Sequence, residues 1–265
     1  IGTTIKFSKI SVGATENTII AACLAKGKTI LKNCAIEPEI KDLTNFLNSA
    51  GAKIKWKGRT CLVTGVNSLN EISFSVMADR IETGTFCVAA TIAKGDLEIQ
   101  NSNPKVIKTE LNILKRAGAK IKVLENKICI KGPKVIKPIK NLKTKEWPGV
   151  ATDMQSQIMV LMCVANGESS IIENIFENRF LHVGELQRLG AKIKIKNNKA
   201  TIQGNTKFIG AELMSSDLRA SVALVLAAMV SRGKSIINRI YHLDRGYEDI
   251  EKKLRRIGVR IKRLK

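Results

Sequence analysis

The chain has 265 residues, of which 44% are hydrophobic, and a formal net charge of +22. Its length allows one large domain or two ordinary ones, and its apolar fraction is high enough to bury a core, which argues against disorder. The longest apolar run, near residues 222–230, has about half the length that a bilayer crossing requires. We therefore expect a soluble, cytoplasmic protein without a membrane partner.

The cysteines and the basic residues exclude two further classes of protein. Six cysteines occur without any CxxC pair, alongside two histidines, so we expect reduced thiols and neither a zinc site nor a disulfide framework. Lysine alternates with apolar residues in KIKWK (53–57) and KIKIKNN (192–198), which is typical of strands with one solvated face. With only 4% aromatic residues there is little for bases to stack on, so we expect no nucleic-acid partner despite the charge.

Four repeated units follow one another along the chain. The first three contain the tetrapeptide GAKI and the fourth contains GVRI, and their glycines are separated by 67, 72 and 68 residues: Gly51, Gly118, Gly190 and Gly258. A second set of glycines keeps nearly the same spacing: Gly27, Gly95, Gly167 and Gly233. Such self-similarity marks a repeated supersecondary block.

Each unit is expected to be of the βαββ type. A first helix, such as SDLRASVALVLAAMVSRG (216–233), should end at a glycine of the second set in a left-handed cap, and a strand should follow. A second helix should end at the GAKI glycine, and a strand pair with a tight turn should follow it, as at NN in AKIKIKNNKATIQG (191–204). The units must bury their helices against one another, because a helix on a small sheet cannot remain hydrated alone.

The first helices begin at similar polar segments. These segments are ATEN (14–17), DRIETG (79–84), ATDMQ (151–155) and SSDLR (215–219). If three units surround a pseudo-threefold axis, the N-termini of their first helices gather on one face. The partial positive charge and free N–H groups there would favour phosphate or carboxylate.

Six stretches together resemble the enolpyruvyl transferases, and within them the branch that acts on UDP-N-acetylglucosamine. They are SVGATEN (11–17), DRIETGTF (79–86), TDMQSQ (152–157), FENRF (176–180), DLRAS (217–221) and IYHLDRGYEDIEKKLR (240–255). The resemblance implies an α/β fold of inside-out repeats, with two halves of three units each. Residues 1–78 would then be the third unit of an incomplete N-terminal half, and residues 79–265 a complete C-terminal half.

The resemblance also implies an activity. The complete enzyme would transfer the enolpyruvyl group of phosphoenolpyruvate to the 3-hydroxyl of UDP-N-acetylglucosamine, the first committed step of peptidoglycan precursor synthesis, with no cofactor or metal. The acid residue of the family would lie upstream, so we expect this chain to need a separately encoded N-terminal fragment for turnover. Two alternatives remain open: the sister enzyme that acts on shikimate 3-phosphate, and a non-catalytic remnant of a split gene.

The resemblance assigns roles to individual residues. Asp153 would be the general base, and Arg245 would touch phosphoenolpyruvate, whose phosphate and carboxylate suit guanidinium groups. The further substrate-binding residues would be Lys9, Ile10, Ser11, Val12, Gly13, Thr152, Ile175, Arg179 and Arg219. Without the resemblance, Asp153 and Ser11 would be interpreted as helix caps, Gly13 as easing the turn into the helix, and the arginines as solvated charges. His182, His242 and Glu82 are interpreted as structural residues.

Overall fold

A computed structural model describes residues 1–264, and the chain divides into two compact units. Unit 1 comprises Ile1–Met77 together with Glu146–Pro148, and unit 2 comprises the rest of the described chain. Each unit is described by itself below. Within residues 1–264, no helix is both long enough and apolar enough to cross a bilayer.

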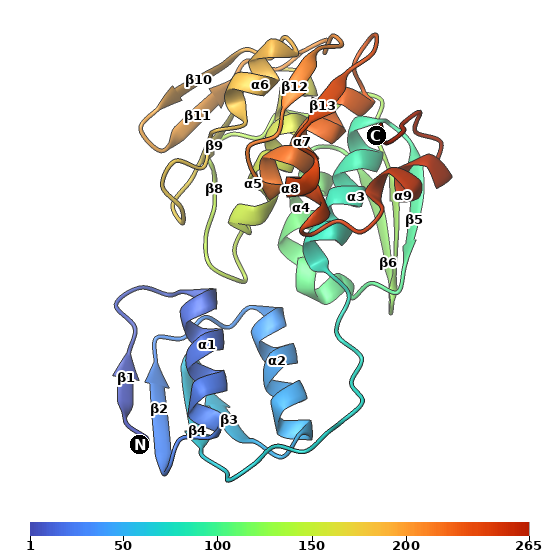
Figure 1. The fold of residues 1–265 in the computed structure, drawn as a ribbon. Helices are drawn as coiled ribbons and strands as arrows, with labels where there is room; N and C mark the ends of the chain where they lie inside the picture. Colours follow the sequence, from blue (N-terminus) through green and yellow to red (C-terminus); the bar gives the residue numbers. More distant parts are fainter. Residues whose placement is uncertain (265) are drawn as a thin grey trace. The chain divides into compact units, whose positions relative to one another are not determined.

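Unit 1 contains one complete copy of the repeat, with two helices on one face of a four-stranded sheet (Figure 1). Its elements are β1 (Thr4–Lys6), α1 (Val12–Cys23), β2 (Lys28–Lys32), α2 (Pro38–Ser49), β3 (Lys53–Lys57) and β4 (Thr60–Thr64). The strand order is β1-β2-β4-β3, with β1 and β2 parallel and the other pairs antiparallel. Ile54 is buried in β3 while its lysine neighbours are exposed, as the alternation in KIKWK predicts.

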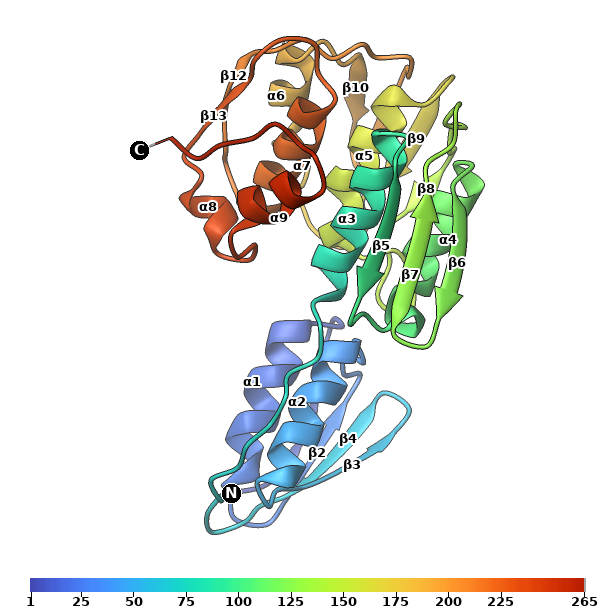
Figure 2. The same ribbon diagram turned by 90° about the vertical axis from the view of Figure 1, so that its right-hand side faces the viewer.

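Unit 2 contains the other three copies (Figures 1 and 2). The second copy comprises α3 (Arg80–Ile92), β5 (Asp96–Gln100), the 3-10 helix η1 (Pro104–Ile107), α4 (Lys108–Arg116), β6 (Lys120–Leu124) and β7 (Lys127–Lys131). The third comprises β8 (Leu142–Lys143), the 3-10 helix η2 (Thr152–Met154), α5 (Gln155–Val164), β9 (Ser169–Ile172), α6 (Val183–Arg188), β10 (Ile193–Lys196) and β11 (Lys199–Ile202). The fourth comprises β12 (Glu212–Met214), α7 (Leu218–Met229), β13 (Ile236–Asn238), α8 (Tyr241–Asp244) and α9 (Ile250–Arg256).

The complete repeat has the order βαβαββ. The third copy has the same strand order as the first, β8-β9-β11-β10, again with the first two strands parallel. The second copy lacks the initial strand and keeps β5-β7-β6, whereas the part of the fourth copy that the structure describes, up to residue 264, contains the parallel pair β12-β13 and no hairpin. The expectation of four units with a terminal strand pair is therefore wrong for the fourth copy. Residues 259–264, which follow Gly258, form no strand.

The GAKI glycines end the second helices, as predicted. All four have φ between 95° and 108°, a region that residues with a Cβ rarely adopt. In the second set, Gly27, Gly167 and Gly233 also have positive φ, but at the second copy Lys94 takes this conformation (φ 56°) instead of Gly95. The NN turn is confirmed, because Asn197 has φ 53° and the adjoining Lys196 and Lys199 are paired.

The four polar segments mark the helix starts correctly at two places, and the interpretation of Ser11 as a cap is confirmed at a third. Asp79 caps α3 and Asp217 caps α7, each through its side chain. Helix α1 begins at Val12 with Ser11 as its cap, two residues before ATEN, and Gly13 lies inside its first turn, not in the turn before it. The segment ATDMQ forms η2 before α5, and Asp153 is not its N-cap.

The first helices of unit 2 lie inside, and the sheets lie outside them (Figure 1). Helix α5 is buried along nine of its ten residues, and α7 along eight of twelve. Side-chain bonds join the N-terminal halves of these helices and of α3: Ser156 Oγ donates to the Arg219 carbonyl (2.8 Å), and Gln157 Nε2 donates to Thr85 Oγ1 in α3 (3.3 Å). The N-termini of α3, α5 and α7 therefore lie close together, as the pseudo-threefold arrangement requires.

Candidate functional site

Asp153 lies in η2, where it meets two arginines from other parts of unit 2. Its Oδ1 accepts a hydrogen bond from Arg179 Nη2 at 2.7 Å, and its Oδ2 accepts one from Arg219 Nη2, also at 2.7 Å. Arg179 precedes α6, and Arg219 lies in the first turn of α7. Three residues that the sequence assigns to the site are thus in direct contact, and 37% of the Asp153 side chain remains exposed to solvent.

Opposing effects determine the charge of this carboxylate. Burial alone would raise the pKa of Asp153, but the charge and hydrogen bond of Arg219, and then the charges of Arg179 and Arg80, outweigh it and lower the pKa below its ordinary value. Asp153 is therefore ionised at neutral pH and can accept a further hydrogen bond. Each ion pair uses a single guanidinium nitrogen, and a guanidinium has five N–H groups, so the arginines retain donors for an anionic ligand.

The backbone at Arg219 is held by the cap of α7. Asp217 Oδ1 accepts hydrogen bonds from the amides of Arg219 and Ala220, both at 2.9 Å. A capped helix start has a defined direction, so the first turn of α7 presents Arg219 towards η2. Burial of the guanidinium opposes its charge, but Asp153 outweighs this effect and raises the pKa of Arg219.

Thr152 and Ile175 are joined through Glu173, a residue that the sequence analysis did not single out. Thr152 Oγ1 donates to Glu173 Oε2 (3.0 Å), and the amide of Ile175 donates to Glu173 Oε1 (2.8 Å). Glu173 is only 4% exposed and directly follows β9. The sequence did contain a signal for Glu173: it follows directly after the apolar pair Ile171–Ile172. A charged residue at the end of a buried strand is itself buried and must find hydrogen-bond partners.

Arg245 does not bond to Asp153 among the described residues. It follows α8 as its C-cap and is exposed. Two residues later, the ring of Tyr247 is 1% exposed, and its hydroxyl lies 2.9 Å from Thr85 Oγ1 and 3.5 Å from Gln157 Nε2. Tyr247, which the sequence analysis also missed, ties the segment that carries Arg245 to α3 and α5.

The remaining predicted binding residues belong to unit 1. Ser11 Oγ accepts a hydrogen bond from the Ala14 amide (3.2 Å), so this serine is the cap of α1, and its hydroxyl proton stays available to a ligand. Lys9 and Gly13 are exposed, whereas Ile10 and Val12 pack partly against the core of the unit. That these residues share a site with Asp153 stays a prediction.

Glu82 and His182, both interpreted as structural, lie outside the Asp153 cluster of ion pairs. Glu82 pairs with Lys253 Nζ at 2.7 Å, and His182 is 2% exposed. The six cysteines are free, and the described residues contain no group of three or more His, Cys, Asp or Glu side chains that could hold a metal ion.

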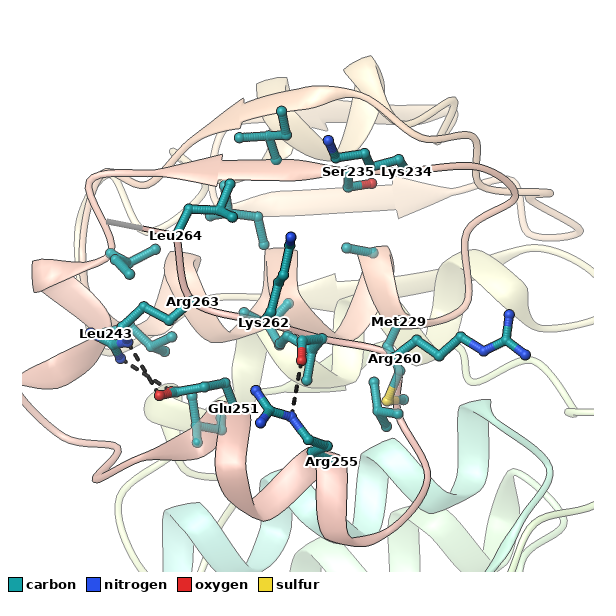
Figure 3. Close-up of a pocket in the computed structure, with 18 of the residues that line it drawn as sticks. Met229, Lys234, Ser235, Leu243, Glu251, Arg255, Arg260, Lys262, Arg263 and Leu264 are labelled. Carbon is teal, nitrogen blue, oxygen red and sulfur yellow. Dashed lines mark hydrogen bonds and ion pairs between the residues drawn. The ribbon is translucent and has the colours of Figure 1, made fainter.

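A hollow of about 980 Å³ lies beside β13, α9 and residues 258–264 (Figure 3). Glu251 contributes to its lining and pairs with Arg263, which also binds Asp244. The hollow contains neither Asp153 nor the two arginines bound to it. The hollow lies next to β13. The corresponding strands of the other copies, β2, β5 and β9, each pair with a strand of the terminal hairpin, so the hollow is not assigned to a substrate.

Known proteins resemble this chain over its whole length. The family model described as EPSP synthase (3-phosphoshikimate 1-carboxyvinyltransferase) matches residues 1–254. A protein of Pelagibacter ubique named UDP-N-acetylglucosamine 1-carboxyvinyltransferase is 62% identical over 265 residues, which are 100% of this chain and 63% of that protein. A protein of Geobacter metallireducens with the same name is 50% identical over the same shares.

Solved structures agree on the fold. The enolpyruvyl transferase NikO from Streptomyces tendae has a TM-score of 0.88 at 25% identity, over 98% of this chain and 65% of its own. An EPSP synthase from Acinetobacter baumannii has a TM-score of 0.78 at 18% identity, over 100% of this chain and 64% of its own, and supports the fold alone. The chain spans 63% of the length of the two curated relatives above. The predicted fold class is confirmed, and the chain belongs to the EPSP synthase family of enolpyruvyl transferases.

Proposed function

We propose that the protein to which this chain belongs transfers the enolpyruvyl group of phosphoenolpyruvate to the 3-hydroxyl of UDP-N-acetylglucosamine and releases phosphate. The observation that carries this proposal is the 62% identity, over all 265 residues, to a relative named UDP-N-acetylglucosamine 1-carboxyvinyltransferase. The protein would then act in the cytoplasm on a peptidoglycan precursor, and so contribute to cell-wall synthesis, cell shape and division.

The acceptor is proposed from the degree of similarity. The family model is described by the shikimate enzyme, but the EPSP synthase structures share only 18% identity with this chain. Proteins named for the UDP-N-acetylglucosamine reaction share 46% to 62%. We therefore favour the amino sugar nucleotide over shikimate 3-phosphate as the acceptor.

Asp153 would act as the general base. In the reaction, the acceptor oxygen bonds to C2 of phosphoenolpyruvate as C3 gains a proton, and elimination then expels phosphate and removes a proton to restore the double bond. The lowered pKa of Asp153, caused by Arg219 and Arg179 against the effect of burial, keeps the carboxylate ready to take the hydroxyl proton, although it also makes it a weaker base. The acid that protonates C3 would belong to the part of the enzyme outside this chain.

Arginines and helix starts would hold the anionic groups. Phosphoenolpyruvate carries a phosphate and a carboxylate, and Arg179, Arg219 and Arg245 supply guanidinium groups that can bind both and stabilise charge as phosphate leaves. The residues Lys9, Ile10, Ser11, Val12 and Gly13, with Thr152 and the main chain of Ile175, would hold the nucleotide sugar. The N-terminus of α1 behind Ser11 suits a diphosphate.

The test is phosphate release by this chain together with the remaining part of the Pelagibacter ubique relative. We expect turnover with phosphoenolpyruvate and UDP-N-acetylglucosamine only when both pieces are present, because the acid would come from the second piece. Asp153→Asn should lower kcat by about 10²-fold or more, since general base catalysis contributes that much. Asp96→Asn, which breaks an exposed ion pair with Lys131, is the matched control and should leave kcat unchanged.

Three outcomes would count against the proposal. Robust turnover by the 265-residue chain alone would contradict the need for a partner fragment. Activity with shikimate 3-phosphate and none with the nucleotide sugar would reassign the acceptor. Full activity of Asp153→Asn would remove Asp153 from its role as the base.

A further inference from the structure

Glu173 is a buried carboxylate whose two oxygens both accept hydrogen bonds. Oε1 accepts from Thr144 Oγ1 (2.8 Å) and from the amides of Ile175 (2.8 Å) and Phe176 (3.1 Å), and Oε2 accepts from Thr152 Oγ1 (3.0 Å). The residue is 4% exposed. Burying a carboxylate is costly unless donors replace the lost water, and four donors do so here.

The backbone of Glu173 is itself held firmly. Its amide donates to the carbonyl of Asn198 (2.8 Å), and Asn198 Nδ2 donates to the carbonyl of Glu173 (3.1 Å). The preceding residues form β9, which pairs with β8 on one side and β11 on the other. The carboxylate is therefore an anchor fixed to the sheet.

Three of the four donors to the Glu173 carboxylate lie in two segments next to the candidate site. Thr152 immediately precedes Asp153, and Phe176 lies three residues before Arg179. These two segments meet again at the ion pair between Asp153 Oδ1 and Arg179 Nη2. Arg219 reaches Asp153 from α7, whose start is held by Asp217 and has no hydrogen bond to Glu173 among the described residues.

We infer that Glu173 is a positioning residue, which holds η2 and the segment 175–179 so that Asp153 and Arg179 stay paired. Its importance for catalysis rests on the proposed function, because only then does the placement of Asp153 govern a proton transfer. A displacement of about 1 Å at a reacting group can cost roughly 10²-fold in rate. Glu173 would thus affect the reaction without touching the substrate.

The first test needs no substrate. The pKa of Asp153 is measured by carbon NMR titration of the 265-residue chain and of Glu173→Ala, Glu173→Gln and Thr152→Val. Glu173→Ala should raise the pKa of Asp153, because the pairing with Arg179 loosens, and Arg179→Ala should raise it in the same direction. Thr152→Val, which removes one of the four donors, should give a smaller rise.

Glu173→Gln tests rescue by a conservative variant. The glutamine carbonyl can still accept from the amides of Ile175 and Phe176, and its NH₂ group can donate to the Thr152 hydroxyl, which then becomes the acceptor. We therefore expect Asp153 to titrate nearly as in the unmodified chain. If Glu173→Ala does not fold, Glu173→Gln and Thr152→Val still decide the question, because Thr152→Val must raise the pKa more than Glu173→Gln does.

Ser169→Ala is the matched control for loss of a buried hydrogen bond, in the strand β9 that Glu173 directly follows. Ser169 Oγ accepts from the amide of Ile139 (3.0 Å), and Ser169 is fully buried. The substitution should destabilise the fold and leave the titration of Asp153 unchanged. If Glu173→Ala and Thr152→Val behave like Ser169→Ala, Glu173 has only a structural role and the inference is wrong.

The second test uses the enzyme assembled from both pieces. Glu173→Ala should lower kcat about 10-fold or more, and the acidic limb of its pH profile should move upward together with the pKa measured by NMR. Glu173→Gln should restore most of kcat. An unchanged kcat and pH profile would overturn the catalytic part of the inference. The assembled enzyme could also fail to use UDP-N-acetylglucosamine while Glu173→Ala still shifts the pKa of Asp153. That result would contradict the proposed function and leave the positioning role of Glu173 intact.

Discussion

Two arginines from separate segments pair with the two oxygens of Asp153, so its charge depends on residues 26 and 66 positions away. The resemblance names all three residues, but it does not say that they touch. Nothing local in TDMQ predicts this pairing, because an aspartate at a helix start is usually a cap. The structure removes that interpretation: the side chain of Asp153 accepts hydrogen bonds from guanidinium groups and leaves the helix start uncapped.

His182 provides a prediction at the same scale. Burial lowers the pKa of this ring from 6.5 to about 4, helped by the charge of Arg179 and opposed by Asp217. Between pH 6.5 and 4, His182 binds a proton in the unfolded chain but not in the folded chain. The contribution of the neutral His182 to the free energy of unfolding is therefore fully present above pH 6.5 and is lost as the pH falls towards 4. The loss should reach roughly 3 kcal/mol.

Urea unfolding at several pH values measures this effect. His182→Gln should flatten the fall in the free energy of unfolding between pH 6.5 and 4, compared with the unmodified chain. An equally steep fall in both proteins would show that other groups cause it.

At the scale of elements, the repeat is set by residues that end helices. Helix α6 shows this within one short segment, because it contains Gly184 and ends before Gly190. Gly190 has φ 99°, whereas Gly184 is helical, and a Cβ added at Gly184 would have no atom within 4 Å. Gly190 is therefore required by its backbone conformation, whereas neither the backbone nor the surrounding space requires a glycine at position 184.

Substituting alanine at each position separates these causes. Gly190→Ala should destabilise the chain by about 1–3 kcal/mol, because a Cβ strains the backbone at this φ. Gly184→Ala should be neutral or stabilise by up to about 1 kcal/mol, because alanine restricts the unfolded chain and favours helix. Denaturant unfolding measures both, and equal effects would contradict the assignment of Gly190 as the obligatory helix end.

The fourth copy of the repeat shows where periodicity in the sequence is insufficient. GVRI resembles GAKI, and Gly258 does end α9 with φ 95°. Residues 259–264 nevertheless form no strand, although Val259 and Ile261 alternate with the basic residues Arg260 and Lys262. A strand exists only where a partner satisfies its backbone groups, and in the other copies that partner is the second strand of the hairpin.

At the scale of the whole molecule, each unit has its own hydrophobic core, and in unit 2 the helices α3 and α5 also share polar bonds with the segment after α8. The Thr85 hydroxyl donates to the Ile81 carbonyl (2.8 Å), so in its contact with Tyr247 the tyrosine is the donor. Gln157 Nε2 reaches both hydroxyls. Bonds among α3, α5 and the segment after α8 thus add specificity to a largely apolar centre.

Tyr247→Phe should destabilise unit 2 by about 1–2 kcal/mol, the usual cost of losing a buried hydrogen bond. It should also speed amide exchange in residues 240–247, the segment that carries Arg245. Tyr241→Phe is the matched control, because Tyr241 is 59% exposed and should change stability by less than about 0.5 kcal/mol. Equal stability and exchange in the two variants would exclude the proposed link.

The sequence by itself determined the repeat, the glycine helix ends, the Asp79 and Asp217 caps and the solvated lysine faces. All of these follow from interactions between residues a few positions apart. Only the tertiary structure decided that Asp153 pairs with Arg179 and Arg219, that Glu173 and Tyr247 connect distant segments, and that residues 259–264 form no strand. Those features depend on which buried groups find partners across the fold, and local patterns carry no information about partners that are distant in the chain.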